Sequence, residues 1–344
     1  MRKTSFTEIF AAGLAILASP LAMASTQTAT LTQTEGEVKL FTQPTKTLPA
    51  AETGVTRALY EGQYFVVKDG KIGDKVDKGT IVRTAPTAKA RVVYDNGDQF
   101  NVGPGTAYQI NWSADTAQAD TKIDLMYGKF RGIVEKGGPR SKLQLRTKSA
   151  VMGVRGTDFF VAANGADNTT EVSILRGAVE LKPEAAKSKP VEVKAGQSAE
   201  VSAPAPTPEH KTTTEKNQAP APVEAKIELR KTTQEDLAGI QKASQLSPNR
   251  ETASAAPAAV TAKLKELEKK AVETTMKDIK NSDAKLYAEI SKKGEPKSMD
   301  DLNNKSVQKL METAPKAPEK HKPYQAELED LEAGAYQRYF KDVQ

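Results

Sequence analysis

Apolar and polar residues alternate over short runs from residue 26 to residue 201, which is the pattern of strands with one buried face. The clearest runs are ARVVYDNGDQFNV, KLQLRT, TEVSILRGAVELK and VEVKAGQSAEV. Turn pairs that contain glycine separate such runs, at Asp69-Gly70, Asn96-Gly97, Pro104-Gly105, Gly137-Gly138, Arg176-Gly177 and Ala195-Gly196. The pattern predicts an all-β N-terminal domain over residues 26–201, built as a short-strand sandwich, a roll or a short solenoid.

The stretch YDNGDQ gives the strongest hairpin signal in this region. Asn-Gly supplies the positive φ angles of a two-residue type I′ turn, so we expect that turn at Asn96-Gly97. Oxygen atoms of Asp95, Asn96 and Asp98 are also ligands that Ca²⁺ accepts, but the ligand spacing of a calcium-binding loop and its final glutamate are missing. We therefore interpret the stretch as a turn and expect no metal.

The pattern changes twice after the β region. Residues 202–222, SAPAPTPEHKTTTEKNQAPAP, are rich in Pro, Ala, Thr and Lys and predict a flexible linker. Residues 223–344 show the helical period and predict a charged, mainly α-helical tail that is partly disordered. Its longest helix candidate has one apolar stripe, formed by Val260, Leu264, Leu267, Ala271, Ile279, Leu286 and Ile290. The tail could form a loose bundle, a coiled coil or helices that order on binding, and self-association is one of its expected roles.

Two further tail helices have recognisable patterns. Ser298 precedes an apolar run, and Asp301 follows three residues later as in a capping box. The last candidate is amphipathic, with Tyr324, Leu328, Leu331, Tyr336 and Phe340 on its apolar face. Lys263, Lys265, Lys269 and Lys270 form a charged face of the longest helix, which we interpret as a solvated surface because Glu266 and Glu268 lie among them.

The N-terminus has the three parts of a secretory signal peptide. Arg2 and Lys3 come first, a short apolar run follows, and Ala22-Met23-Ala24 provides a small-residue cleavage site. We expect a cleavable signal peptide over residues 1–24 and a periplasmic or secreted protein of the cell envelope, with no transmembrane segment after cleavage. The alternative is an uncleaved N-terminal anchor.

Composition excludes some chemistry. The chain has 344 residues, no cysteine and a net charge of +6 from 50 basic and 44 acidic residues. Disulfides and thiol catalysis are therefore excluded, and such a mild, mixed charge gives no reason to expect a nucleic-acid partner. The two histidines, His210 and His321, lie in Pro- and Lys-rich surroundings typical of linkers. We expect no cofactor and no enzymatic activity.

The stretch KSAVMGVRGTDFFV, residues 148–161, is the strongest candidate for a functional motif. Neither the phosphate-binding loops nor the nucleophile elbow has this pattern, because a strand pattern follows the glycines where those motifs need a helix or a serine. Its two glycines favour a tight corner between two strands, at Gln144–Val151 and Asp158–Ala162. Arg155 can reach backbone carbonyls or a carboxylate such as Asp158, and its geometry suits a fixed, partly buried partner, while the hydroxyl of Thr157 can close the turn. The candidate structural or partner-binding residues are Gly153, Val154, Arg155, Gly156, Thr157, Asp158 and Phe159.

The sequence TKSAVMGVRGTDFFV resembles the signature of the FecR domain family, T-P-x-A-V-x-G-V-R-G-T-x-F-x-V. The segments TEGEVKLF, LMYGKFRGIV, TEVSILRGAVEL and VEVKAGQSAEV resemble other parts of that family in the same order, so that the likeness covers about Leu31 to Val201. Lys148 departs from the pattern, since the family often has proline there. The resemblance implies a FecR-like β fold outside the cytoplasm. Because about eight residues precede the apolar run, we expect no cytoplasmic anti-sigma segment, and the regulatory role of family members does not carry over.

These observations predict a non-catalytic envelope protein that acts as a protein-binding or scaffold module, with another envelope protein as its partner. One alternative is a module that binds peptidoglycan or polysaccharide, for which Trp112 is the candidate ligand contact, although it also suits a core position at a strand end. Another is a signalling regulator that resembles the periplasmic half of a FecR-type sigma-factor regulator. A hydrolase with paired carboxylates is a further alternative, but the sequence places no such pair.

Overall fold

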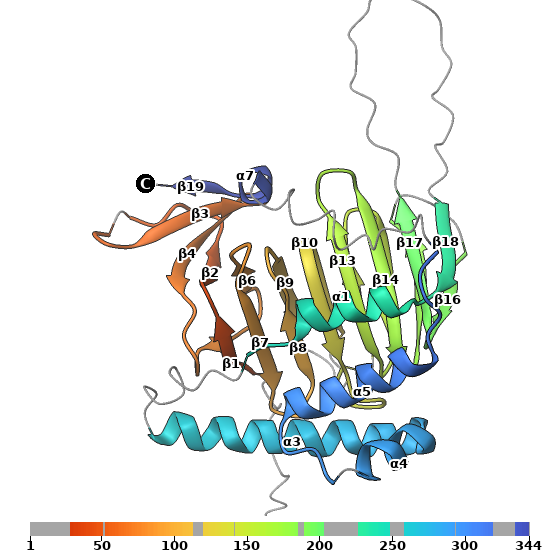
Figure 1. Ribbon diagram of the computed structural model, residues 1–344. Coiled ribbons are helices and arrows are strands. Elements are labelled where there is room, and N and C mark those ends of the chain that lie inside the picture. The colour runs from red at the N-terminus through yellow and green to blue at the C-terminus, as the bar shows by residue number, and fades with distance from the viewer. Residues whose placement is uncertain are drawn as a thin grey trace, which may run out of the picture.

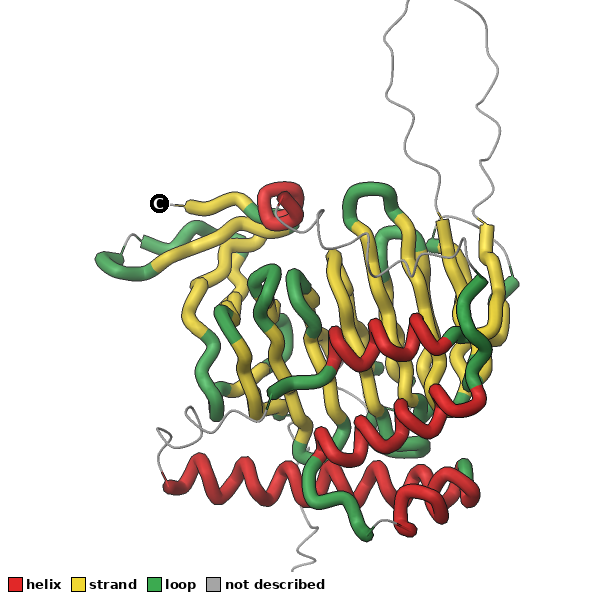
Figure 2. Tube along the Cα trace, in the orientation of Figure 1, coloured by secondary structure: helices red, strands yellow, loops and turns green. Residues whose placement is uncertain are grey.

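The computed structural model describes residues 28–50, 52–112, 120–140, 142–184, 189–202, 226–247, 258–292, 294–318 and 334–343. Two β-sheets pack face to face in this part of the chain, and helices cover one of them (Figures 1 and 2). The predicted signal peptide and nearly all of the predicted linker lie outside the described residues, as do His210 and His321. Within the described residues, none of the helices combines the length and apolar character that crossing a bilayer requires.

Sheet A is antiparallel throughout. Its strands lie in the order β5 (Lys75–Val76), β1 (Ala29–Glu35), β7 (Lys89–Tyr94), β8 (Gln99–Val102), β10 (Thr121–Ile133), β13 (Asp158–Asn164), β14 (Thr169–Arg176), β17 (Gln197–Ser202) and β18 (Lys226–Lys231).

Sheet B is antiparallel except between β10 and β11. Its order is β19 (Lys341–Val343), β3 (Thr56–Tyr60), β4 (Gln63–Asp69), β2 (Val38–Thr45), β6 (Ile81–Thr84), β9 (Ala107–Trp112), the first half of β10, β11 (Leu143–Arg146), β12 (Ala150–Val154), β15 (Ala178–Pro183) and β16 (Val191–Lys194).

Strand β10 belongs to both sheets because it bends at one glycine. Residues 121–127 pair with β9 in sheet B, and residues 128–133 pair with β8 and β13 in sheet A. Gly128 has a φ of +98°, and a Cβ there would lie 2.4 Å from Oγ1 of Thr106. Only glycine accommodates this backbone and this close approach, so Gly128 allows one strand to join the two sheets.

The main core lies between the sheets and draws on alternate residues of both, among them Leu31, Val92, Phe100, Phe130, Phe159 and Val161 of sheet A and Leu40, Tyr108, Ile123, Leu145, Met152 and Leu181 of sheet B. This confirms the all-β domain predicted from alternation, and of the architectures left open it selects the sandwich. The hairpin at β7 and β8 is also confirmed, but its predicted turn type is wrong. The loop has three residues, and of Asn96 and Gly97 only Gly97 has a positive φ, which is a type I turn with a glycine bulge.

The described part of the tail contains the helices α1 (Gln234–Ser244), α3 (Ala258–Ser282), α4 (Ala284–Lys292), α5 (Met299–Thr313) and α7 (Ala335–Tyr339). The predicted stripe faces inward, and Leu267, Ala271 and Ile279 are buried with Val93 of sheet A. The long helix breaks at Asp283, whose side chain accepts a hydrogen bond from the N–H of Leu286 and begins α4. Ser298 caps α5 as predicted. Strands β18 and β19 lie in the range for which the sequence indicated helices, and much of the last amphipathic candidate lies outside the described residues.

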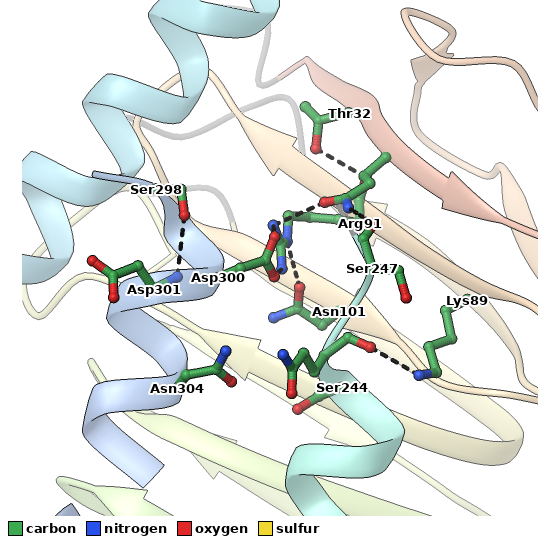
Figure 3. Close-up of polar contacts among 12 residues, drawn as sticks. Thr32, Lys89, Arg91, Asn101, Ser244, Ser247, Ser298, Asp300, Asp301 and Asn304 are labelled. Carbon is green, nitrogen blue, oxygen red and sulfur yellow. Dashed lines mark hydrogen bonds and ion pairs between the residues drawn. The ribbon is translucent and has the colours of Figure 1, made fainter. Parts of the chain in front are cut away.

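Three aspartates, each from a different helix, form ion pairs with arginines of sheet A. Asp300 of α5 accepts hydrogen bonds from both terminal nitrogens of Arg91, at 2.6 and 3.3 Å, while Arg91 Nε donates to Asn101 (Figure 3). Asp278 of α3 lies 3.6 Å from Arg176 of β14. Asp236 of α1 pairs with Arg230 of β18. These arginines lie on or beside the face of sheet A that the helices cover, so helix and sheet neutralise each other's buried charge.

Arg230 also bonds Glu171 of β14, so that two carboxylates share one guanidinium. Burial raises the pKa of Asp236, but hydrogen bonds from Arg230 and from the N–H of Thr233 outweigh it, and its pKa lies below the usual value. Glu171 is only 2% exposed, and its Oε2 has no hydrogen-bond partner within the described structure. Burial therefore raises the pKa of Glu171 to about 7, and Glu171 is the carboxyl that takes up a proton.

Replacing Glu171 by glutamine is expected to change how stability depends on pH. The folded chain binds a proton at Glu171 up to about pH 7 and the unfolded chain only up to its ordinary pKa of 4.5, so the wild type loses stability as pH rises through this window. Urea unfolding measures this as a free energy of unfolding at each pH. As pH rises from 4 to 8, the unfolding free energy of Glu171→Gln should increase by about 3 kcal/mol relative to that of the wild type. Glu192→Gln, at an exposed position, is the control, and a difference that does not vary with pH would contradict the assignment.

Candidate functional site

The predicted signature carries the chain from one sheet to the other. Strand β12 ends at Val154 in sheet B, and β13 begins at Asp158 in sheet A, so residues 155–157 form the corner. The strand predicted at Gln144–Val151 is wrong, because the chain turns after Arg146 and β11 and β12 pair antiparallel. Val154 and Phe159 are buried in the main core on either side of it. The N–H of Val134 donates to the carbonyl of Thr157 at 3.0 Å, which binds the corner to the end of β10.

Gly156 lies at the tightest point of the corner. Its φ is +71°, and a Cβ on it would lie 2.3 Å from the Cα of Lys136. Gly177 packs against the same corner, where a Cβ would lie 3.0 Å from the carbonyl oxygen of Gly156. These contacts are backbone contacts that a larger residue cannot relieve by rotating a side chain. Gly156 is thus needed by the fold.

Asp158 takes a different partner from the one expected. Arg131 of β10 donates to both of its oxygens, at 2.9 Å from Nε and 2.8 Å from Nη2, and both side chains are buried. This bidentate pair occupies both oxygens of Asp158, so Asp158 is not the partner of Arg155. The side chain of Arg155 is exposed instead. The Thr157 hydroxyl does not close the turn either, because it is buried without a hydrogen-bond partner in the described structure.

Gly153 and Arg155 are exposed on the outer face of sheet B, whereas Val154 between them is buried. Gly153 lies directly opposite Gln144 of β11 on one side and Glu180 of β15 on the other, and Glu180 lies opposite Glu192 of β16. Directly opposed residues share a face of a sheet. These four residues therefore form one row across the outer face, in which Gly153 alone has no side chain.

This gap lies within a groove of about 820 Å³. Gly153 and Ala178 have no large side chain, so the base of the groove lies close to the backbone of the sheet. Ser282 at the end of α3 also lines the groove. The other lining residues are Lys136, Lys142, Leu143, Gln144, Val154, Arg155, Gly156, Gly177, Val179, Glu180 and Glu192. The groove thus combines residues of the signature with residues from three further strands, the corner after β10 and a helix of the tail.

The fold does not need glycine at position 153. Its φ lies outside the left-handed region, and an added Cβ would meet nothing closer than 3.9 Å, where it touches Glu180. A side chain fits there, but it would project into the groove. The two glycines of the signature therefore differ, since Gly156 serves the corner and Gly153 keeps the groove open.

Three cations of the groove lining have no ion-pair partner within the described residues. In the part of the chain that the structure describes, the charged groups of Lys136, Lys142 and Arg155 form no ion pair or hydrogen bond. The carboxylates of Glu180 and Glu192 come from β15 and β16, and Glu192 pairs with Lys194 at 3.2 Å. Unpaired cations beside an open floor suit a ligand that brings carboxylates or other anions.

Neither the candidate glycan contact at Trp112 nor a metal site is found at this groove among the described residues. Trp112, at the end of β9, is partly buried and packs against the main core, and it does not line the groove. Within the described residues, no cluster of three or more acidic or histidine side chains is placed to hold a metal ion.

Sequence reasoning missed Lys136, Lys142, Glu180, Glu192 and Ser282. They come from separate elements, so no local spacing links them. The available signal was Gly153 itself, a glycine at an outward-facing position of a strand that the pattern of alternation would fill with a side chain.

Alanine at the two glycines should separate these roles. Gly156→Ala is expected to lose about 2–4 kcal/mol of unfolding free energy, because the positive φ and the contact with Lys136 both oppose a Cβ. Gly153→Ala, three residues away, should change stability by less than about 1 kcal/mol. Urea denaturation of the two variants checks this, and equal losses would contradict the division.

Comparison with known proteins finds a family match over the part of the chain that contains the signature. The model of the family described as "FecR protein" matches residues 80–180, a shorter range than the sequence resemblance indicated. No curated protein matches the chain. Two crystal structures described as a "putative anti-sigma factor" from Parabacteroides distasonis, at 2.50 and 1.65 Å resolution, are each 15% identical to the chain with a TM-score of 0.34. Each alignment covers 46% of this chain, and 62% and 63% of theirs, so the match spans less than two thirds of their length. The β-sandwich of this chain thus contains a FecR-like domain, whose signature forms the corner between β12 and β13.

Proposed function

We propose that this protein is a non-catalytic protein-binding or scaffold module of the cell envelope whose FecR-like domain binds an extended segment of a protein partner in the groove at the signature. The observation that carries the proposal is the groove itself, with its floor at Gly153 and Ala178 and its unpaired cations Lys136, Lys142 and Arg155. The periplasmic location rests on the signal-peptide pattern of residues 1–24.

The shape and charge of the groove favour an extended, partly acidic segment. A floor formed by residues without large side chains lets the backbone of a bound segment approach the sheet closely. Lys142 and Arg155 flank β12 where it ends, so an acidic residue of the partner would bind there with a charge-assisted hydrogen bond from the guanidinium. Carboxylates on β15 and β16 would disfavour an acidic residue at the opposite wall.

The alternatives have weaker support in the same groove. Glu180 and Glu192 are directly opposed across β15 and β16, but both are exposed, and Glu192 is paired with Lys194. General acid catalysis by a carboxyl needs a protected environment that keeps the proton. A glycan-binding module would use an exposed aromatic surface, whereas Trp112 packs on the core.

A photocrosslinker at Gln144, on the groove wall, is expected to trap a protein segment in living cells. Mass spectrometry should identify an acidic, extended segment, and a synthetic peptide of that sequence should bind the purified chain. Lys142→Glu with Arg155→Glu should weaken this peptide about tenfold or more, since the loss of one charged contact is worth at least 1.4 kcal/mol. Higher salt should weaken it in the same direction.

Two controls decide the outcome. A crosslinker at Lys182, on the same sheet but outside the groove lining, should not trap that segment. Gly153→Val should block the peptide while the chain stays folded. The proposal fails if adducts consist of wall glycan only, or if the adducts from Gln144 and Lys182 are identical and insensitive to the two charge reversals.

A further inference from the structure

A second apolar cluster lies on the outer face of sheet B, apart from the main core. It contains Phe41, Ala58, Tyr60, Phe65, Ile81, Ala107, Met126 and Tyr127 from the sandwich. The remaining buried members, Ala335 and Phe340, come from the last residues of the chain. The C-terminal segment, defined here as residues 334–343, thus covers an apolar patch of the sandwich, and α7 and β19 lie beside β3 (Figure 1).

Aromatic rings anchor the C-terminal segment in this patch. Phe340 is 3% exposed, and its ring centroid lies 5.0 Å from that of Phe41 and 5.3 Å from that of Tyr60. Tyr339 lies 5.2 Å from Tyr127, and its hydroxyl donates to the carbonyl of Met126 at 2.8 Å. Buried aromatic side chains with one polar contact are typical anchors of peptide recognition.

The backbone of the C-terminal segment completes the contact by extending sheet B. Lys341, Asp342 and Val343 pair antiparallel with Leu59, Ala58 and Arg57, so β19 covers the edge of β3. Addition of a strand to a sheet edge, with side chains in adjacent pockets, is an established mode of peptide binding. The sandwich therefore presents a complete peptide-binding site, and its occupant is part of the same chain.

The strand that this segment adds to the sheet is short. Three residues form β19, and residues 319–333 separate the C-terminal segment from Pro318. Covalent attachment to the same chain favours binding within one molecule at low protein concentration. Where copies are concentrated, the same segment of a neighbouring chain competes for the same site.

We propose that the patch around Phe41 and Tyr60 is an exchangeable strand-binding site that accepts the C-terminal segment of a second copy of this chain. Departure of Phe340 would expose the aromatic cluster and the edge of β3 together, and a second copy carries the matching segment. Reciprocal exchange gives a closed dimer, and one-way exchange gives a chain of molecules. This self-association uses a surface distinct from the groove at Gly153.

Cysteine pairs test the exchange directly, because the full chain has no cysteine of its own. Leu59 and Lys341 are opposed across β3 and β19, and neither side chain is fully buried. The double variant Leu59→Cys, Lys341→Cys should form a disulfide within one molecule under mild oxidation. An equimolar mixture of the two single variants should form a disulfide-linked heterodimer, whose yield rises with protein concentration.

The control mixture pairs Lys341→Cys with Lys194→Cys, an exposed position on β16 at the other edge of sheet B. Adding Phe340→Ala to the Lys341→Cys chain should lower the heterodimer yield about tenfold or more, since loss of a buried phenylalanine costs more than the 1.4 kcal/mol of a tenfold change. The proposal is overturned if the double variant closes internally while the mixed single variants crosslink no more than the control. Failure of the double variant to close also overturns it, because β19 would then not occupy β3.

Discussion

Buried charge on the helix-facing side of sheet A is the constraint on which the rest of the structure depends. Arg91, Arg131 and Arg176 lie buried on that sheet, and a buried guanidinium without a partner costs several kcal/mol. Arg131 finds Asp158 within the sheet, whereas Arg91 and Arg176 depend on Asp300 and Asp278 of the helices. The sandwich and the helices that follow it in sequence are therefore one packed body in the described structure.

The same constraint shapes the groove. Asp278, besides facing Arg176, accepts a hydrogen bond from the N–H of Lys136 at 3.0 Å, and Lys136 is the residue against which Gly156 packs. The end of α3 thereby reaches the signature corner, and Ser282 lines the groove. A ligand at the FecR-like signature would contact a surface that the helical tail helps to build, so in the proposed mode of binding the tail would take part in recognition.

The described residues after position 226 cover part of each sheet, and the interactions differ between the two sheets. On sheet A, aspartates meet arginines and an apolar helix stripe meets Val93. On the outer face of sheet B, aromatic rings and a short strand cover an apolar patch. On the same outer face of sheet B, but on its other strands, the row through Gly153 stays open to solvent. The proposed groove and the proposed strand-binding site therefore use separate surfaces.

The sequence by itself determined the elements whose cause is local. Alternation located strands of the sandwich, Ser298 marked the start of α5, and the glycines of the signature indicated a corner before Asp158, because these signals arise within a few residues. The single strand expected at Gln144–Val151 was wrong, because a turn there separates β11 from β12. The tertiary structure alone decided the partner of Asp158, the position of β18 and β19, and the groove. Those features join residues far apart in sequence, and their energies depend on burial and charge pairing, which no local pattern records.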